Sequence, residues 1–127
     1  MPTTNQGARR ADELRAISDA ISRITRDGTG RGPVHARAIR DDDAVVVLLS
    51  GGLPKGEPSL VADGRPDAVL ALRREFQDLL RPEYVAAVEE ITGRRVVTFM
   101  STNTTMPDHA AEIFLLGDAL EPAPDAG

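Results

Sequence analysis

The chain has 127 residues, no cysteine and a formal net charge of −5. This length suits one ordinary domain, and the lack of cysteine excludes disulfides, thiolate catalysis and zinc sites built on cysteine. An acidic chain with three phenylalanines, one tyrosine and no tryptophan lacks the basic, ring-rich surface that is typical of nucleic-acid binding.

Nothing in the sequence predicts secretion or insertion into a membrane. Residues 1–11 lack the apolar core of a signal peptide. The longest apolar run, at 44–49, has six residues. A membrane-spanning helix needs roughly 20 such residues. We therefore expect a cytoplasmic protein with no direct membrane insertion.

A helix and a hairpin are predicted for the first part of the chain. Apolar residues recur every three or four positions over residues 8–26, as on one face of a helix. Residues 34–40 alternate as in a strand with one buried face, and Asp41–Asp43 suits a turn. The β-branched run at 44–49 is typical of a central strand, and the turn would pair it with the first strand.

A segment rich in glycine and proline, residues 50–65, separates this hairpin from a second predicted helix. A loop of this length is often functional, and it has room for one short helical turn at 57–62. Apolar spacing predicts the second helix over residues 66–92. Pro82 lies inside it, so we expect the helix to be kinked or broken near Pro82, because the proline ring clashes with the preceding turn.

Two more strands are predicted, over residues 95–103 and 109–116, with a loop at 104–108. Alternation in the first of them sets three residues on one face, Val97, Phe99 and Ser101, against Val96, Thr98 and Met100. Alternation in the second sets Ala110, Glu112, Phe114 and Leu116 against Ala111, Ile113 and Leu115.

The predicted order is α-β-β-α-β-β, an α+β domain with a four-stranded, mainly antiparallel sheet and both helices packed on one face. We expect a single domain at 8–116, a flexible N-terminus at 1–7 and a disordered, proline-rich tail at 117–127. Apolar residues on the other face predict a second layer supplied by another subunit. A homodimer is therefore expected.

The tripeptide Thr-Gly-Arg occurs twice, at 29–31 and 92–94, and each copy closes a predicted helix before a strand. The helix-and-hairpin unit is thus built twice. Glycines 28, 30 and 32 do not predict a phosphate-binding loop, because such a loop precedes a helix and these follow one.

Several blocks of the chain, in order from Leu14 to Leu116, resemble the MpsC-like family of small bacterial proteins. The matching blocks include Thr29-Gly30-Arg31-Gly32-Pro33, Leu72-Arg73-Arg74, Val88 to Val96, Phe99-Met100-Ser101 and Glu112-Ile113-Phe114. The family is named after a component of a Na⁺-translocating, membrane-potential-generating system. The resemblance implies a link to membrane ion or inorganic-carbon transport and no established catalytic residue or cofactor. Pro54 and Pro58 depart from the family pattern, which tends to be helical there.

Four arginines are candidates for an anion or partner site: Arg31, Arg37, Arg94 and Arg95. If the two repeated units are related by a pseudo-two-fold axis, their guanidinium groups would meet near one end of the sheet. There they would hold a carboxylate, phosphate or bicarbonate by paired hydrogen bonds. The alternative is structural: the arginines pair with Glu89, Glu90 and the carbonyls at helix ends.

Two polar residues in the third predicted strand, Ser101 and Asn103, are further candidates. They share a face, so they would line a small pocket or form hydrogen bonds across a dimer. Alternatively, they lie exposed near the end of the strand. The two histidines, His35 and His109, begin strands, and His109 points away from Glu112 because three residues separate them. We predict no metal site and no catalytic residue.

The sequence favours a non-enzymatic interaction or regulatory module, which the family resemblance makes accessory to a membrane ion or inorganic-carbon transport system, with a transport protein as partner. One alternative is a sensor of small anions or metabolites, using the arginines and the 50–65 loop as a lid. Another is an enzyme of unknown reaction, for which a buried carboxylate beside a histidine would be the indication. No cofactor is expected.

Overall fold

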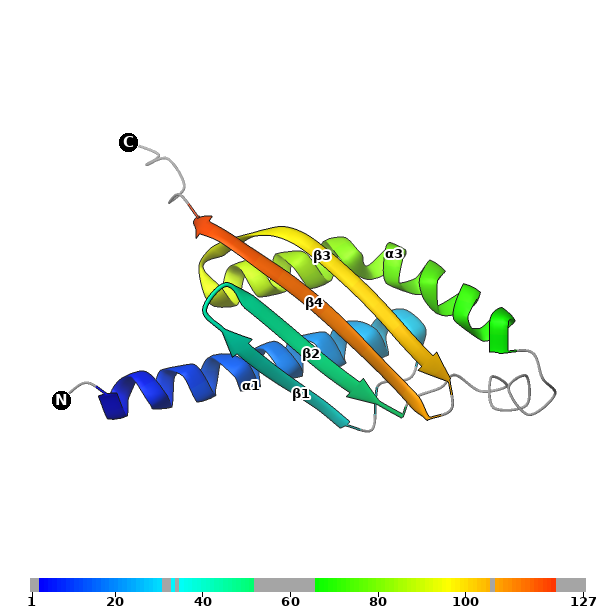
Figure 1. Ribbon diagram of the computed structural model, residues 1–127, viewed down its shortest axis with the longest axis horizontal. Coiled ribbons are helices and arrows are strands. Elements are labelled where there is room, and N and C mark those ends of the chain that lie inside the picture. Colours follow the sequence, from blue (N-terminus) through cyan, green and yellow to red (C-terminus); the bar gives the residue numbers. More distant parts are fainter. Residues whose placement is uncertain (1–2, 31–32, 34, 52–65, 106, 121–127) are drawn as a thin grey trace.

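The computed structural model describes residues 3–30, 33, 35–51, 66–105 and 107–120. The elements follow in the order α1 (Thr3–Thr29), β1 (His35–Asp41), β2 (Ala44–Ser50), α3 (Pro66–Thr92), β3 (Arg94–Thr105) and β4 (Asp108–Ala119). Figure 1 shows both helices lying along the same face of a single sheet. The predicted α-β-β-α-β-β order and the α+β class are confirmed.

The four strands pair in the order β1-β2-β4-β3, and every pairing is antiparallel. Each hairpin stays together, and the second strands of the two hairpins, β2 and β4, meet in the middle of the sheet. The open edges are β1 and β3. This arrangement places the most apolar strands at the centre, where both neighbours satisfy their backbone groups.

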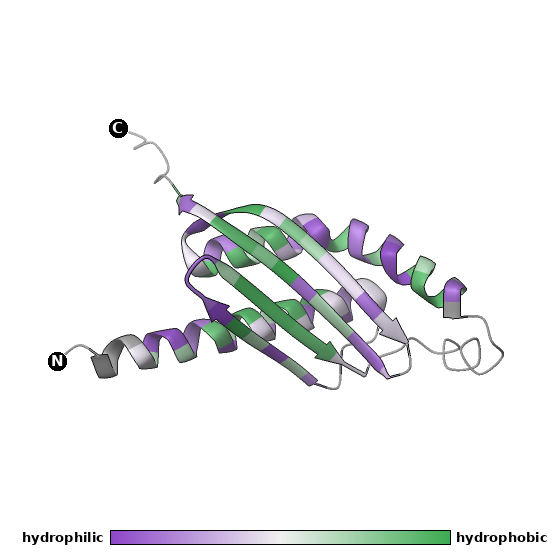
Figure 2. Ribbon diagram, in the orientation of Figure 1, coloured by the Kyte–Doolittle hydropathy of each residue, from purple (hydrophilic) through white to green (hydrophobic). Residues whose placement is uncertain are grey.

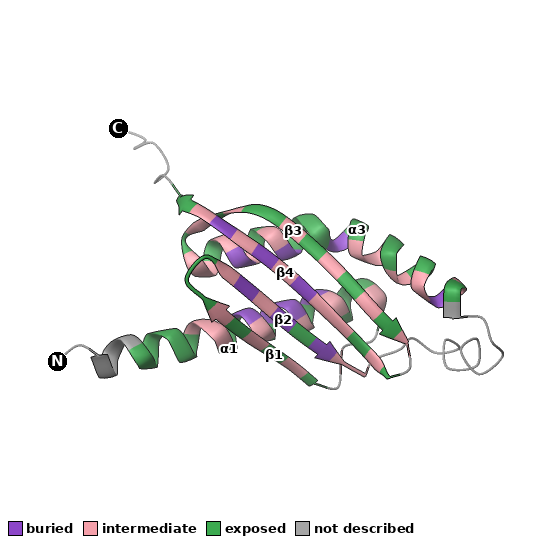
Figure 3. Ribbon diagram, in the orientation of Figure 1, coloured by how far each residue is buried: buried purple, intermediate pink, exposed green. Residues whose placement is uncertain are grey.

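The core lies between the sheet and the two helices. Ile17 and Ile21 of α1 are fully buried against Val45 and Val47 of β2 and Phe114 of β4, because alternate strand residues point to this face. The helix α3 adds Leu80, Tyr84 and Val88 to the same core cluster. Figure 3 shows the buried positions alternating along the two central strands.

The repeated Thr-Gly dipeptide ends both helices in the same way. Gly30 and Gly93 have φ values of 81° and 71°, a left-handed conformation that glycine adopts without a Cβ clash. Each glycine N–H donates to a carbonyl four residues back, at 2.8 Å. The hydroxyls of Thr29 and Thr92 donate to carbonyls in the last turn, both at 2.7 Å. The predicted duplication of the helix stop is confirmed.

The sequence predicts a kink or a break near Pro82. There is no break, because α3 is one continuous helix from Pro66 to Thr92, and Figure 1 shows it bowed. Proline removes one backbone hydrogen bond, that to the carbonyl of Asp78, and both residues are exposed. Water can therefore solvate the carbonyl. Leu80 and Tyr84, buried on either side of the proline, hold the two halves against the same core.

The predicted alternation in β3 is wrong at Val97. The pairing with β4 shifts twice: β4 has an extra residue between the pairs of Arg94 and Val96, and β3 has one between the pairs of Val96 and Thr98. Val96 therefore packs on the core, on the same face as Phe99, and Val97 is 59% exposed. Gly117 lies beside the shift, where an added Cβ would come within 2.7 Å of Val97 Cγ1.

Several elements are longer than the sequence predicts. Helix α1 begins at Thr3 and continues through Gly28 to Thr29, and β4 continues to Ala119. Residues 3–7 and 117–119 thus join elements of the fold, because neither stretch contains a proline that would stop a helix or a strand. The loop at 52–65, with its predicted helical turn, and the tail from 121 lie outside the described residues.

Gly28 of α1 lies directly against the Leu80 side chain of α3. A Cβ at this position would lie 2.5 Å from Cδ2 of Leu80, which is 5% exposed. We expect Gly28→Val to lower the free energy of unfolding by about 1–3 kcal/mol through overpacking. Gly7→Val in the same helix, with nothing within 4 Å of the added Cβ, should stay within about 0.5 kcal/mol of the parent. Urea unfolding followed by circular dichroism compares them, and equal effects would contradict this packing.

Candidate functional site

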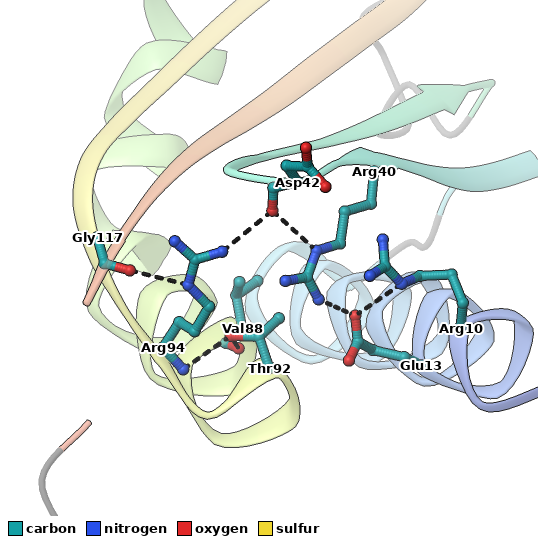
Figure 4. A network of polar contacts seen from close by, with 8 residues as sticks. All are labelled: Arg10, Glu13, Arg40, Asp42, Val88, Thr92, Arg94 and Gly117. Atoms are coloured by element: carbon teal, nitrogen blue, oxygen red, sulfur yellow. Dashed lines mark hydrogen bonds and ion pairs between the residues drawn. The ribbon is translucent and has the colours of Figure 1, made fainter. Parts of the chain in front are cut away.

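Arg94 lies in a polar network at the end of the sheet where the two hairpins meet (Figure 4). Its guanidinium donates to the carbonyl of Gly117 at 2.8 Å and to the carbonyl of Asp42 at 3.2 Å. It also pairs with the carboxylate of Asp43 at 2.7 Å. Arg94 therefore fastens the β1–β2 turn to β4, and its donors are used inside the fold.

A second arginine, Arg40, completes this network on the helix side. Its guanidinium donates to the carbonyl of Asp42 at 3.2 Å and forms an ion pair with Glu13 of α1. Arg40 is 8% exposed, so the pair is largely shielded from water. Figure 4 shows both arginines converging on Asp42, which has a φ of 44° in the turn. This part of the structure fixes the turn.

The four arginine candidates are not gathered at one site in the described residues. Arg94 is held in the network above, and Arg95 is exposed at the start of β3. Arg37 is exposed on the sheet face away from the helices, several residues along β1 from the turn. Arg31 lies outside the described residues. Glu89, a partner expected from the sequence, accepts the Val96 N–H at 2.9 Å instead.

The sheet face away from the helices carries apolar residues in register across all four strands. The strand pairings align a middle row of Ile39, Val46, Ile113 and Met100. The row on one side is Asp41, Ala44, Leu115 and Thr98, and the row on the other is Arg37, Leu48, Ala111 and Thr102. Ile39, Leu48 and Met100 are 39–45% exposed, so no described element covers them. Figure 2 shows the hydrophobic stretch over β2 and the middle of β4. We call this surface the open face.

A hollow of about 430 Å³ lies at one end of the open face. Its lining includes Arg37, Leu48, Ser50, Thr104 and the two histidines, His35 and His109. The open face therefore changes from apolar at its middle row to polar and basic at this end.

On the opposite, helix-covered face, β4 buries a carboxyl group, that of Glu112, which is not among the site residues predicted from the sequence. Glu112 is 1% exposed, and Gln77 of α3 donates to its Oε1 at 3.2 Å. Its Oε2 has no hydrogen-bond partner among the described residues. Burial raises the pKa of Glu112 to about 7, and the hydrogen bond from the Gln77 amide limits the rise.

Two residues predicted from the sequence, Ser101 and Asn103, lie beside this carboxyl group. Ser101 is the cross-strand partner of Glu112, and its Oγ is buried with no hydrogen-bond partner in the described structure. The side-chain N–H of Asn103 donates to Gln77 Oε1 at 2.9 Å, and Gln77 in turn donates to Glu112. The chain of amides thus ends at the carboxyl group.

A cavity of about 80 Å³ opens beside Glu112, between the helices and the sheet. Its apolar walls are Leu49, Phe76, Leu80 and Ala110, and Asn103 lies on its lining as well. At its rim Arg73 forms an ion pair with Asp108, and both side chains are at most 15% exposed. We call this the Glu112 cavity. It combines apolar walls with a few polar groups, as small-molecule sites do.

Tyr84 contributes a hydroxyl to the same cavity from α3. This hydroxyl lies 2.7 Å from the hydroxyl of Thr25. The Thr25 hydroxyl donates to the carbonyl of Ile21, so Tyr84 is the donor in the pair. Burial raises the pKa of Tyr84 to about 12, which keeps the phenol protonated.

The expectation that His109 points away from Glu112 is confirmed. His109 is exposed and lines the hollow on the open face, and Glu112 is buried under the helices. The carboxylate-histidine pair that would indicate an enzyme is not formed by these two residues. Within the part of the chain that the structure describes, no three His, Cys, Asp or Glu side chains gather as metal ligands.

Fold and site together define a small α+β protein with a buried carboxyl cavity and a sheet face that none of the described elements covers. The chain belongs to the MpsC family, described as a Na⁺-translocating membrane potential-generating system, whose model matches residues 10–118. The predicted family resemblance is confirmed. Comparison with curated proteins and with solved structures found no match. Neither helix in the described part of the chain has the length and apolar character that crossing a bilayer requires.

Proposed function

We propose that the chain is a cytoplasmic, non-enzymatic accessory module of a Na⁺-translocating membrane-potential-generating system, and that it acts as a homodimer through its open face. The observation that carries this proposal is the apolar middle row, Ile39, Val46, Ile113 and Met100, which crosses all four strands and which no described element covers. Exposed apolar surface of this kind marks interaction sites. The link to the membrane system is supported by the family description.

The choice of a second copy as the occupant follows from the register of the open face. A two-fold axis along the middle row would exchange the two flanking rows. Asp41 would then lie opposite Arg37 of the partner subunit, and Leu115 opposite the partner's Ala111. An acidic side chain would then contact a basic one across the interface, and a large apolar side chain would pack against a small one. Such self-complementarity is what an isologous dimer interface requires.

Charge reversal tests this geometry. We expect light scattering at micromolar concentration to give a dimer mass for the parent chain. Arg37→Asp should weaken the dimer about tenfold, because two like-charged pairs form by symmetry. Asp41→Arg should do the same, and the double exchange should restore the parent affinity.

An apolar position gives a stronger effect and a control. Ile113→Asp would bury an unpaired charge at the centre of the interface and should yield a monomer. Leu79→Asp, on α3 at a side chain that is 69% exposed, should remain dimeric. The proposal is overturned if the parent chain has the mass of one subunit, or if the double variant dimerises as weakly as the single variants.

The place in a membrane system is tested separately, in the native host. We expect a tagged parent chain to co-purify with a membrane transport protein identified by mass spectrometry, and the Leu79→Asp control to do so equally. Recovery of the chain without any membrane protein after mild cross-linking would contradict the accessory role, while leaving the dimer unaffected.

A further inference from the structure

We propose that the Glu112 cavity is a binding site for a small organic cation, a protonated amine carried on a short apolar body. This site is distinct from the open face, because side chains at alternate positions of β4 point to opposite faces of the sheet. The inference goes beyond the accessory role above and does not depend on it.

The carboxyl group at the polar end of the cavity is only partly hydrogen-bonded. Gln77 donates one amide N–H to Glu112 Oε1, and its carbonyl oxygen accepts from Asn103. Glu112 Oε2 is left without a partner among the described residues, in a side chain that is 1% exposed. A buried, unpaired carboxylate oxygen is costly, and a charged donor at that position satisfies it.

The charges around the cavity favour a cation. At the rim, Arg73 and Asp108 neutralise each other in an ion pair. Tyr84 is a neutral phenol whose O–H donates a hydrogen bond to the hydroxyl of Thr25. Glu112 is therefore the lining group whose charge is not balanced by a described neighbour. An anion placed there would be repelled by it.

Size and walls define the rest of the ligand. The cavity has a volume of about 80 Å³, and its walls include Leu49, Phe76, Leu80 and Ala110. Liquid water occupies about 30 Å³ per molecule, so the space suits a group of about three to five non-hydrogen atoms. Propylammonium has this size, with one charged end and three carbons.

Binding of such a cation should depend on pH through Glu112. The groups that face it are Gln77 and Tyr84 from α3, Ser101 and Asn103 from β3, and Thr25 from α1, with Arg73 and Asp108 at the rim. Its pKa is raised to about 7, and an alkylammonium stays protonated to about pH 10. Because the cation pairs with the carboxylate form, its affinity should rise about tenfold between pH 6 and pH 8.

The test is a titration of the ¹⁵N-labelled chain with propylammonium chloride, followed by NMR. We expect saturable amide shifts, in the millimolar range, around Gln77, Asn103 and Glu112. Propionate and 1-propanol are controls of the same size with the opposite charge or none. Sodium chloride at equal concentration measures the effect of ionic strength.

Two variants probe the site in different ways, with a matched control. Glu112→Gln removes the charge at constant shape and should weaken propylammonium binding at least tenfold. Ala110→Val fills the cavity and leaves the carboxyl group in place, and it should abolish binding. Glu90→Gln, at an exposed glutamate of α3, should bind as the parent does. The proposal is overturned if propanol or propionate binds as tightly as the amine, if Glu112→Gln binds like Glu90→Gln, or if no saturable shift occurs.

Discussion

Replacing Glu112 with glutamine is expected to raise the free energy of unfolding at pH 8 by about 3 kcal/mol and to change it little at pH 4. The physical reason is burial, which raises the pKa of Glu112 from its ordinary value of 4.5 to about 7. Each unit of such a difference corresponds to about 1.4 kcal/mol. Glutamine has nearly the same shape, and its amide can donate to the unpaired Ser101 hydroxyl beside it.

The sign follows from proton binding. Below pH 4.5 Glu112 is protonated in both the folded and the unfolded chain, so its burial carries no ionisation cost. Between pH 4.5 and about 7 the folded chain binds more protons, and this group's contribution to stability falls as the pH rises. Above that range the folded chain bears the whole free-energy cost of burying an ionised carboxylate. Glutamine does not titrate, so the Glu112→Gln chain does not bear this cost.

Urea unfolding of the parent and Glu112→Gln chains at each pH from 4 to 8 measures this difference. Glu90→Gln, an exposed glutamate on α3, serves as the control and should track the parent at every pH. If the difference in unfolding free energy between the parent and Glu112→Gln is the same at pH 4 and pH 8, the pKa of Glu112 is not raised by burial.

Phe114→Ala is expected to lower the free energy of unfolding by about 3–5 kcal/mol, a large part of the total for a domain of this size. Phe114 is fully buried at the centre of the sheet, on β4. Its ring packs on Phe99 with centroids 5.1 Å apart, and Phe99 contacts the Tyr84 ring at 6.1 Å. Truncation would leave a cavity between the sheet and both helices.

Thermal and urea unfolding, followed by circular dichroism, measure the loss. Leu79→Ala is the control, since Leu79 is 69% exposed, and it should change stability by less than about 0.5 kcal/mol. If the two variants lose the same free energy of unfolding, Phe114 is not part of the buried core.

Much of the fold follows from local patterns in the sequence. Apolar spacing predicted both helices, alternation predicted three of the strands, and the β-branched run at 44–49 predicted the other. The glycines at 30 and 93 predicted where the helices stop, because left-handed backbone at those positions suits glycine. Such features involve residues within a few positions of one another, and a single sequence contains them directly.

The candidate site was predicted less completely. The sequence predicts Asn103 as a pocket residue, and Asn103 lines the Glu112 cavity, next to Ser101 on the same strand face. Glu112 is not among the predicted site residues, although its place among Ala110, Phe114 and Leu116 on one strand face is a signal. A charged residue within an apolar face points to a buried group with a role. The arginines were expected together because they repeat in sequence, and repetition does not fix their direction in space.

The sequence by itself determined the class of the domain, the order of its elements and the residues that end its helices, since short-range periodicity and glycine geometry decide these. Only the tertiary structure decided the strand order, the extra residue at Val97 and the partner of Arg94, an aspartate 51 positions away. It also decided that the Glu112 carboxyl group lies under the helices and not in water. Burial and long-range pairing arise when distant segments pack together, and no local pattern contains that information.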